Sequence, residues 1–114
     1  MTRLPVDDHY APLYSLGQVA EMLRVRQAFL RRLDDFEVVR PHRSDGGQRR
    51  YSRADITLVQ YVVELSGEGM TLIAIRRVLE LEHQVRVLQR ELEAARRLLR
   101  LSGLDPSAPP PAAP

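Results

Sequence analysis

The stretch that decides the fold of this chain is Pro41-His42-Arg43-Ser44-Asp45-Gly46-Gly47-Gln48-Arg49-Arg50-Tyr51. Two β-branched residues precede its proline, a glycine pair lies in its middle, and a charged run ends on an aromatic residue. This pattern predicts a two-stranded β-hairpin with its tip at residues 45–47. The glycines allow the backbone to approach a phosphate chain closely, and the flanking arginines would neutralise that chain. Beside a helix-turn-helix, such a hairpin is a wing.

Two short helices are predicted upstream of the hairpin. Ser15 and Gln18 have the spacing of a capping box, and apolar residues then recur at helical intervals as far as Leu23. A second helix over residues 26–35 exposes Arg26, Gln27, Arg31 and Arg32. Two helices joined by a tight turn, the second rich in arginine, form the outline of a helix-turn-helix. Taken alone, this outline also fits any small helical hairpin.

The charge of the chain is concentrated in the same region. All 17 basic residues among the 114 are arginine, and the 15 acids leave a net charge of only +2. Residues 24–53, however, hold nine arginines against four acids, which is the electrostatic footprint of a nucleic-acid binder. Two less specific interpretations stay open: arginine usage can reflect a GC-rich genome, and an isolated pair such as Arg49 and Arg50 is usually surface charge.

A long apolar seam is predicted downstream. A third helix opens at Ser52, with Asp55 in the capping position, and Thr71 caps the next helix. The last helix, about 33 Å long, carries apolar residues at spacings of 4, 3, 4, 3 and 4: Leu81, Val85, Leu88, Leu92, Ala95 and Leu99. A chain with so few other elements has little to cover this seam, so a second copy is favoured over packing within the chain.

These observations divide the chain into four parts. We expect a flexible arm at 1–13, a DNA-binding domain at 14–78, a dimerisation helix at 79–101 and a disordered Pro/Ala-rich tail at 102–114. The chain has no cysteine, its histidines lack metal spacing, and no nucleophile and base are paired. We therefore expect no catalytic residue, metal or cofactor. Without an apolar run of membrane-spanning length or a signal peptide, a cytoplasmic protein is the default expectation.

The order of these elements resembles the MerR family of transcriptional regulators. The resemblance covers residues 14–100 and includes features of the short HspR-type heat-shock repressors, which lack an effector-binding domain. The resemblance rests on the following residues: Tyr14-Ser15-Leu16-Gly17-Gln18-Val19-Ala20, Leu30-Arg31, Gly46-Gly47-Gln48-Arg49-Arg50-Tyr51-Ser52, Asp55-Ile56, Gly69-Met70-Thr71-Leu72, Ile75 and Val78-Leu79-Glu80.

The resemblance implies a mainly α fold with a small β-hairpin: a winged helix-turn-helix followed by a long helix that dimerises as an antiparallel coiled coil. Two recognition helices would enter successive major grooves of an inverted repeat. The implied contacts are Arg26, Gln27 and Ala28 to bases, Arg31 and Arg32 on the same helix, and Arg43, Gly47, Arg49, Arg50 and Tyr51 in the wing. Tyr51 is alternatively a core aromatic with a satisfied hydroxyl.

The implied function is a dimeric, sequence-specific regulator in the nucleoid, a repressor by analogy with the HspR-type proteins and working with a chaperone-like co-regulator. The alternative is a coiled-coil interaction protein, or an architectural DNA-binding protein that works with a partner. The sequence contains no cysteine to serve as the ligands of metal-sensing members, and we expect no large C-terminal domain like that of drug-sensing members. A signal would therefore act through a partner, abundance or cooperative assembly.

The chain departs from the family pattern at several positions. Arg32-Leu33 replace a Tyr-Tyr pair, and Glu37 replaces a glycine before the strand. Arg26-Gln27 replace a small polar or Pro pair, and Phe29 replaces a threonine. These differences affect which DNA sequence is recognised and how the protein contacts the DNA backbone. The fold is expected to persist, because the buried positions keep their apolar character.

Overall fold

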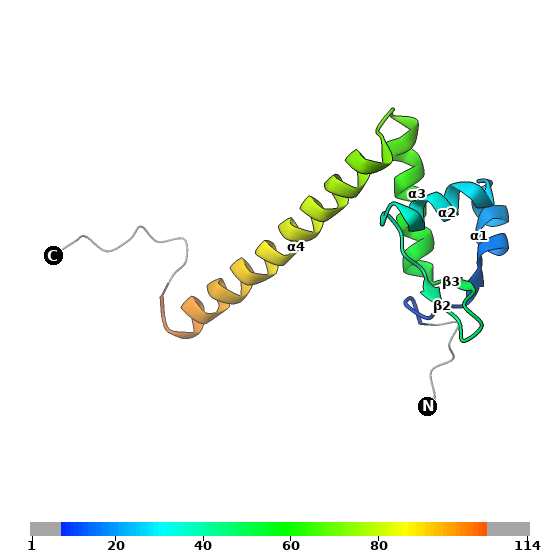
Figure 1. Cartoon of the computed structure of the whole chain (residues 1–114). Helices are drawn as coiled ribbons and strands as arrows, with labels where there is room; N and C mark the ends of the chain where they lie inside the picture. The colour runs from blue at the N-terminus through cyan, green and yellow to red at the C-terminus, as the bar shows by residue number, and fades with distance from the viewer. Residues whose placement is uncertain (1–7, 105–114) are drawn as a thin grey trace. The chain divides into compact units, whose positions relative to one another are not determined.

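The computed structural model describes residues 8–104, which form two compact units that divide between Leu79 and Glu80. The elements follow in chain order (Figure 1): β1 (Tyr14–Ser15), α1 (Leu16–Leu23), α2 (Gln27–Asp35), β2 (His42–Arg43), β3 (Arg49–Tyr51), α3 (Arg53–Gly67) and α4 (Leu72–Leu101). The fold is mainly helical with a small antiparallel sheet, which confirms the predicted fold class.

The sheet has three strands, whereas the sequence predicted two. β2 and β3 form the predicted hairpin, in which His42 pairs with Arg50. The third strand is β1, which lies on the other side of β3 and pairs Tyr14 with Tyr51. A two-residue strand has no measurable periodicity, which is why the sequence did not reveal it. Because β1 runs directly into α1, it ties the base of the wing to the start of that helix.

Two capping boxes fix where helices begin, and both were predicted. At α1 the Gln18 amide donates to Ser15 Oγ at 3.1 Å, and the Ser15 amide donates to Gln18 Oε1 at 2.8 Å. At α3 the same exchange joins Ser52 and Asp55, at 3.0 and 2.9 Å. Each box satisfies helix-end donors that have no intrahelical partner. The sheet therefore passes into α1 and into α3 at defined residues.

A tight turn at Arg24 separates α1 from α2. Arg24 adopts a left-handed conformation with φ of 54°, and the Val25 amide donates to the Ala20 carbonyl at 3.0 Å. The second helix begins at Gln27, one residue later than predicted, with Arg26 in the N-cap position. Leu30 and Leu33 are buried against the core, so the arginines between them face outward.

The core of the first unit is aliphatic with one buried tyrosine. Its largest side chains with less than 2% exposure are Tyr51, Leu30, Leu33, Ile75, Val19, Val39, Val59 and Val62. They come from α1, α2, β3, α3, α4 and the segment before β2. The helix-turn-helix and the wing are thus held on one shared core, which sets their relative placement.

The last helix is longer than predicted. The sequence placed the dimerisation helix at 79–101, after a separate shorter helix, but α4 runs unbroken from Leu72 to Leu101. It contains neither glycine nor proline, so nothing interrupts it. Thr71 Oγ1 caps its start by accepting from the Ala74 amide at 3.2 Å. Among residues 8–104, no helix is long and apolar enough to cross a membrane.

The two predicted terminal segments are only partly described. Residues 1–7 of the expected arm and 105–114 of the expected tail lie outside the described residues. The His9 carbonyl accepts from the Ala54 amide at 3.0 Å, so this part of the expected arm is attached to the first turn of α3. Ser102, Gly103 and Leu104, the first residues of the expected tail, form the α4 C-cap: Gly103 has φ of 77°, and the Leu104 amide donates to the Leu99 carbonyl at 2.7 Å.

Candidate nucleic-acid interface

All five side chains predicted for the recognition helix lie at the protein surface, on α2 or at its N-cap. Arg26, Gln27, Ala28, Arg31 and Arg32 are exposed. Arg31 Nη2 donates to Gln27 Oε1 across one helical turn, at 3.5 Å. Arg26 precedes the helix, and its side chain makes no capping hydrogen bond. The start of α2 therefore offers polar and cationic side chains to a ligand outside the protein.

The wing ends in a tight turn that requires a glycine. The Gly47 amide donates to the Ser44 carbonyl at 2.8 Å, and the Ser44 amide donates to the Gln48 carbonyl at 2.8 Å. Gly47 has φ of 80°, a conformation that side chains with a Cβ rarely adopt. Just after the turn, Arg50 Nη2 donates to Gln48 Oε1 at 3.2 Å. The predicted hairpin tip at 45–47 is confirmed.

One acid on α2 holds two arginines of the wing. Asp34 Oδ2 accepts from Arg49 Nε at 2.8 Å and from Arg43 Nη2 at 3.0 Å. The side chains of Asp34 and Arg49 are only 12% and 18% exposed, whereas Arg43 is 50% exposed. In the sequence, Asp34 counted only as one of the four acids among residues 24–53. The sequence did contain an indication that Asp34 is partly buried: it follows the buried Leu30 by four residues, which places its carboxylate beside the buried face of the helix.

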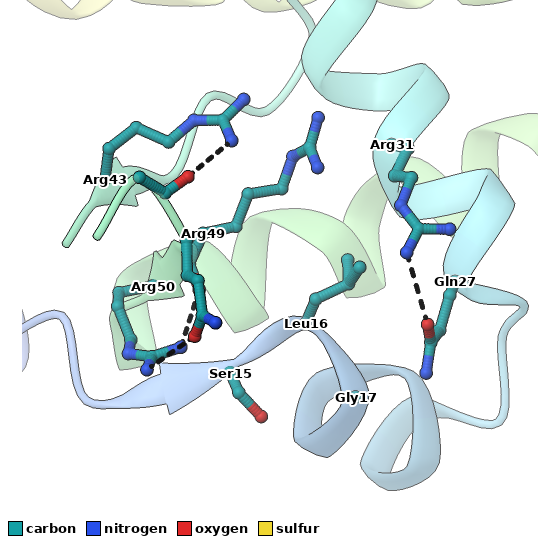
Figure 2. Close-up of a pocket in the computed structure, with 10 residues that line it drawn as sticks. Ser15, Leu16, Gly17, Gln27, Arg31, Arg43, Arg49 and Arg50 are labelled. Carbon is teal, nitrogen blue, oxygen red and sulfur yellow. Dashed lines mark hydrogen bonds between the residues drawn. The ribbon is translucent and has the colours of Figure 1, made fainter.

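The wing, α2 and the start of α1 enclose a cavity of about 380 Å³. Figure 2 shows Arg31 and Gln27 on one side of it and Arg43, Arg49 and Arg50 on the other, with α1 beneath. The lining residues are Ser15, Leu16, Gly17, Gln27, Arg31, Arg43, Gly47, Gln48, Arg49 and Arg50. Six of the ten predicted DNA contacts therefore meet here, although they come from two segments of the sequence.

The cavity has the electrostatic character of an anion site. It collects four guanidinium groups, and one carboxylate, that of Asp34, pairs with two of them. The N-terminus of α1 also lines it through Leu16 and Gly17, whose amides are in the first helical turn and have no carbonyl partner within the helix. Helix N-termini carry partial positive charge and favour phosphates. No residue of α1 was among the DNA contacts predicted from the sequence.

The remaining recognition-helix residues lie elsewhere. Arg26, Ala28 and Arg32 line a second, more apolar hollow of about 570 Å³. Phe29 and Val63 contribute to its wall. The five predicted α2 residues are therefore divided between two surfaces, with Gln27 and Arg31 facing the wing.

Tyr51 is a core residue. The sequence left two roles open for it, and the structure buries its side chain completely. Burial raises the pKa of Tyr51 from its ordinary value of 10.0 to about 12, so its hydroxyl stays neutral to a higher pH than that of an exposed tyrosine. Contrary to the satisfied hydroxyl that the core alternative supposed, this hydroxyl has no hydrogen-bond partner among residues 8–104. Tyr51 is removed from the candidate DNA contacts, because a side chain with no exposed surface cannot touch a phosphate.

The predicted seam on α4 is exposed along its length. Leu81, Val85, Leu88 and Leu92 have exposures between 43% and 62%, and Leu99 is 38% exposed. Ala95 is exposed as well. Among residues 8–104, no three histidine or acidic side chains are grouped as they would be around a metal ion.

A capped helix, a tight turn, an arginine-bearing second helix and a glycine-tipped wing fixed to that helix together define a winged helix-turn-helix, a DNA-binding architecture. Comparison with known families gives the same result. Residues 14–82, more than half of the chain, match the MerR helix-turn-helix family of regulatory proteins. The chain belongs to the MerR family, whose members are transcriptional regulators that bind DNA and are not enzymes.

One relative is the heat shock protein HspR of Streptomyces coelicolor. It is 41% identical over 79 residues, which cover 68% of this chain and 52% of HspR. The chain therefore matches about half the length of that relative. This similarity agrees with the resemblance to HspR-type proteins that the sequence indicated.

Solved structures give the same fold. The N-terminal part of MtaN, the Bacillus subtilis multidrug transporter activator, matches with a TM-score of 0.55 and 25% identity, over 79% of this chain and 94% of that one. HiNmlR, a MerR-family regulator lacking the sensor domain and solved bound to promoter DNA, matches with a TM-score of 0.55 and 22% identity, over 79% and 84% of the two chains.

Proposed function

We propose that this protein is a dimeric, sequence-specific transcriptional regulator that binds an inverted-repeat operator through α2 and the wing. Residues 14–78 would form the DNA-binding domain and residues 79–101 the dimerisation helix. The observation that carries the proposal is the arginine-lined cavity between α1, α2 and the wing. HiNmlR, a MerR-family regulator with the same fold, was solved bound to promoter DNA.

The DNA backbone would occupy the arginine-lined cavity. Among residues 8–104, the guanidinium groups of Arg31 and Arg50 donate to neutral oxygens of Gln27, Gln48 and Arg49 and pair with no carboxylate, so they are available to phosphate oxygens. Arginine suits this role because its planar group can donate two parallel hydrogen bonds to one phosphate. Such contacts fix the orientation of the protein on the duplex without reading its sequence.

Sequence would be read from the start of α2. Arg26, Gln27 and Ala28 are exposed at the N-terminal end of this helix, which is the end that contacts base edges in helix-turn-helix proteins. An arginine can donate two hydrogen bonds to guanine, and a glutamine can pair with adenine. Gln27 is the central candidate, because it also lines the cavity where the backbone contacts converge.

The exposed seam supports pairing with a second copy. Its positions are symmetric about Arg90: Leu88 and Leu92 lie two residues away, Val85 and Ala95 five, and Leu81 and Leu99 nine. In an antiparallel pair centred there, Ala95 faces Val85 of the partner subunit, so a small residue meets a larger one. A parallel pair would instead place two alanines in one layer and leave it underfilled.

Orientation can be tested by disulfide cross-linking, because the chain contains no cysteine. Leu81→Cys and Leu99→Cys are prepared separately, then mixed and oxidised. An antiparallel dimer predicts a cross-link only in the mixture, since residue 81 lies beside residue 99 of the partner subunit. A cross-link in Leu81→Cys alone would show a parallel dimer instead.

By analogy with the HspR-type repressors that the sequence resembles, we further propose that the protein is a repressor that takes its signal from a chaperone-like co-regulator and acts in the nucleoid. The relative that it matches is a heat shock protein. A reporter gene placed behind the operator tests the direction: expression should rise when the regulator is deleted. If expression falls on deletion, the protein is an activator.

A second candidate function is architectural DNA binding together with a partner protein. It is favoured by the composition of the cavity, whose four arginines suit phosphates rather than bases. Immunoprecipitation of bound DNA from cells identifies the preferred site, and titration of the full-length protein with that site and with random duplex measures the preference. Our proposal predicts at least 100-fold tighter binding to the inverted repeat and a steep fall in affinity with salt.

The two functions give different results in that titration. Equal affinity for every duplex at physiological salt would support the architectural role. Failure to bind any duplex would exclude both and leave a coiled-coil interaction protein.

A further inference from the structure

We propose that Asp34 is a positioning residue that sets DNA specificity by fixing the wing relative to the recognition helix. This inference rests on the proposed function and concerns the same interface. Asp34 is not a predicted DNA contact: its side chain is only 12% exposed and is occupied by two arginines of the wing. Its role would be exerted through those arginines.

The geometry joins the wing to α2 through a single carboxylate oxygen. Asp34 Oδ2 accepts from Arg49 Nε on β3 and from Arg43 Nη2 on β2. Arg43 Nη1 also donates to the Gly47 carbonyl at 3.1 Å, so the chain of contacts continues from α2 through Arg43 to the tip of the wing. Both strands and the turn between them are thus attached to one position on the helix.

That position lies on the same stripe of α2 as the proposed base-reading residue. Gln27, Arg31 and Asp34 are at i, i+4 and i+7, a spacing that places them on one helix face. Gln27 and Arg31 are hydrogen-bonded to each other at 3.5 Å. The stripe therefore carries the candidate base contact at one end, a backbone contact in the middle and the anchor of the wing at the other end.

The charge of Asp34 acts against non-specific DNA binding. Its negative charge offsets one positive charge at the cavity, and its carboxylate forms ion pairs with both Arg43 and Arg49. Its loss would leave both guanidinium groups free to follow any phosphate chain. Replacement of Asp34 should therefore weaken discrimination between sites while leaving non-specific affinity equal or higher, the opposite of what loss of a DNA-contacting arginine does.

The test compares Asp34→Asn with Asp45→Asn. Both changes remove one negative charge, but Asp45 lies exposed at the wing tip and makes no ion pair with any of residues 8–104. Affinities of the full-length dimer for its operator and for random duplex of equal length are measured at several salt concentrations. We expect the ratio of the two affinities to fall at least tenfold in Asp34→Asn and to change less than twofold in Asp45→Asn. Equal ratios in the two variants would overturn the inference.

A second measurement follows the wing without DNA. Amide hydrogen exchange at Ser44 and Gly47, whose amides close the turn, should accelerate in Asp34→Asn and not in Asp45→Asn. Thermal melting establishes that both variants fold. If Asp34→Asn does not fold, Asp34→Glu replaces it: the charge is kept but displaced by one methylene, and its ratio should fall more than threefold while that of Asp45→Glu is unchanged. An unchanged ratio in Asp34→Glu would overturn the inference.

The outcomes separate this inference from the proposed function. If the wild-type protein does not discriminate between operator and random duplex, the proposed function fails and the exchange measurement alone tests whether Asp34 holds the wing. If the wild-type protein discriminates and Asp34→Asn does so equally well, only the positioning role fails.

Discussion

In the unit that ends at Leu79, thirteen apolar side chains are buried, whereas among the described residues from Glu80 onward none is. The first unit also begins α1 and α3 with capping boxes and joins its wing to α2 by ion pairs. The second presents a row of leucines to solvent. This difference indicates that the first unit can fold by itself, because its apolar side chains are already buried. The seam can stabilise the protein only when another surface packs against it.

The substitution with the largest expected effect disrupts the seam of the second unit and leaves the first unit unchanged. Leu88→Glu places an unpaired charge at the centre of the seam, where a dimer would bury it. We expect a monomer by light scattering and a loss of about 100-fold in operator affinity, because two recognition helices no longer bind together. Arg86→Glu, outside the seam, should remain a dimer. A dimer of Leu88→Glu would show that the seam is not the interface.

The same kind of substitution in the two units sharpens the comparison. Leu33→Ala, in the fully buried core, should lower the free energy of unfolding by about 2–5 kcal/mol at every protein concentration. Leu92→Ala should lower it by an amount that depends on protein concentration, because the seam is buried only in the dimer. Urea denaturation over a hundredfold range of concentration distinguishes the two. Concentration-independent loss in Leu92→Ala would argue for burial within the chain.

Two substitutions of polar residues distinguish contacts to the DNA backbone from contacts to the bases. Arg50→Ala should weaken binding to all duplexes by about tenfold and reduce the salt slope by about one, as expected for one lost phosphate contact. Gln27→Ala should change the ranking of related sites instead, with discrimination altered by about 1–3 kcal/mol at one base pair. Arg50 is preferred to Arg49 here because Arg49 is already paired with Asp34. An unchanged ranking in Gln27→Ala would move the base contacts elsewhere on α2.

Tyr51→Phe tests whether this residue serves the core. DNA affinity should be unchanged within about twofold, and stability at pH 7 should change by about 1 kcal/mol or less, since the hydroxyl has no hydrogen-bond partner among the described residues.

The same variant also tests the pH dependence of stability. Because the pKa of Tyr51 is raised from 10.0 to about 12 in the folded protein, the unfolded chain loses this proton at a lower pH than the folded chain does. Wild-type stability should therefore decline as pH rises from 10 towards 12, by about 1 kcal/mol per pH unit from this group, and the phenylalanine variant should decline less. Equal declines in denaturation midpoints at pH 9 and 11 would contradict burial of the hydroxyl.

The smallest effect concerns the loop between α2 and β2. Glu37 has φ of 58°, a left-handed conformation that is strained for any residue with a Cβ. Its ion pair with Arg40 is long, at 3.8 Å, and highly exposed. Glu37→Gly should therefore raise the free energy of unfolding by about 0.5–1 kcal/mol, since relief of strain exceeds the added freedom of the unfolded chain. Thermal melting that shows destabilisation would mean that the ion pair outweighs the strain.

The features that could be predicted from sequence are those that depend on neighbouring residues. The pairs Ser15 with Gln18 and Ser52 with Asp55 lie three residues apart, and the glycine tip of the wing is a local turn. The role of Asp34 depends on arginines nine and fifteen residues away, so no local pattern contains it. The same holds for β1, which is defined by its pairing with β3, and for Tyr51, whose position in the wing sequence suggested exposure while its partners in three dimensions bury it.

The exposed seam on α4 also bears on how long the protein survives in a cell. If dimers bury this row of leucines, dilution uncovers it, and newly made or scarce chains present an apolar helix that proteases and chaperones recognise. Abundant protein would then be protected by its own pairing and scarce protein would be removed. Its lifetime would consequently depend on its own concentration, and its level would respond more steeply than in proportion to the rate of synthesis.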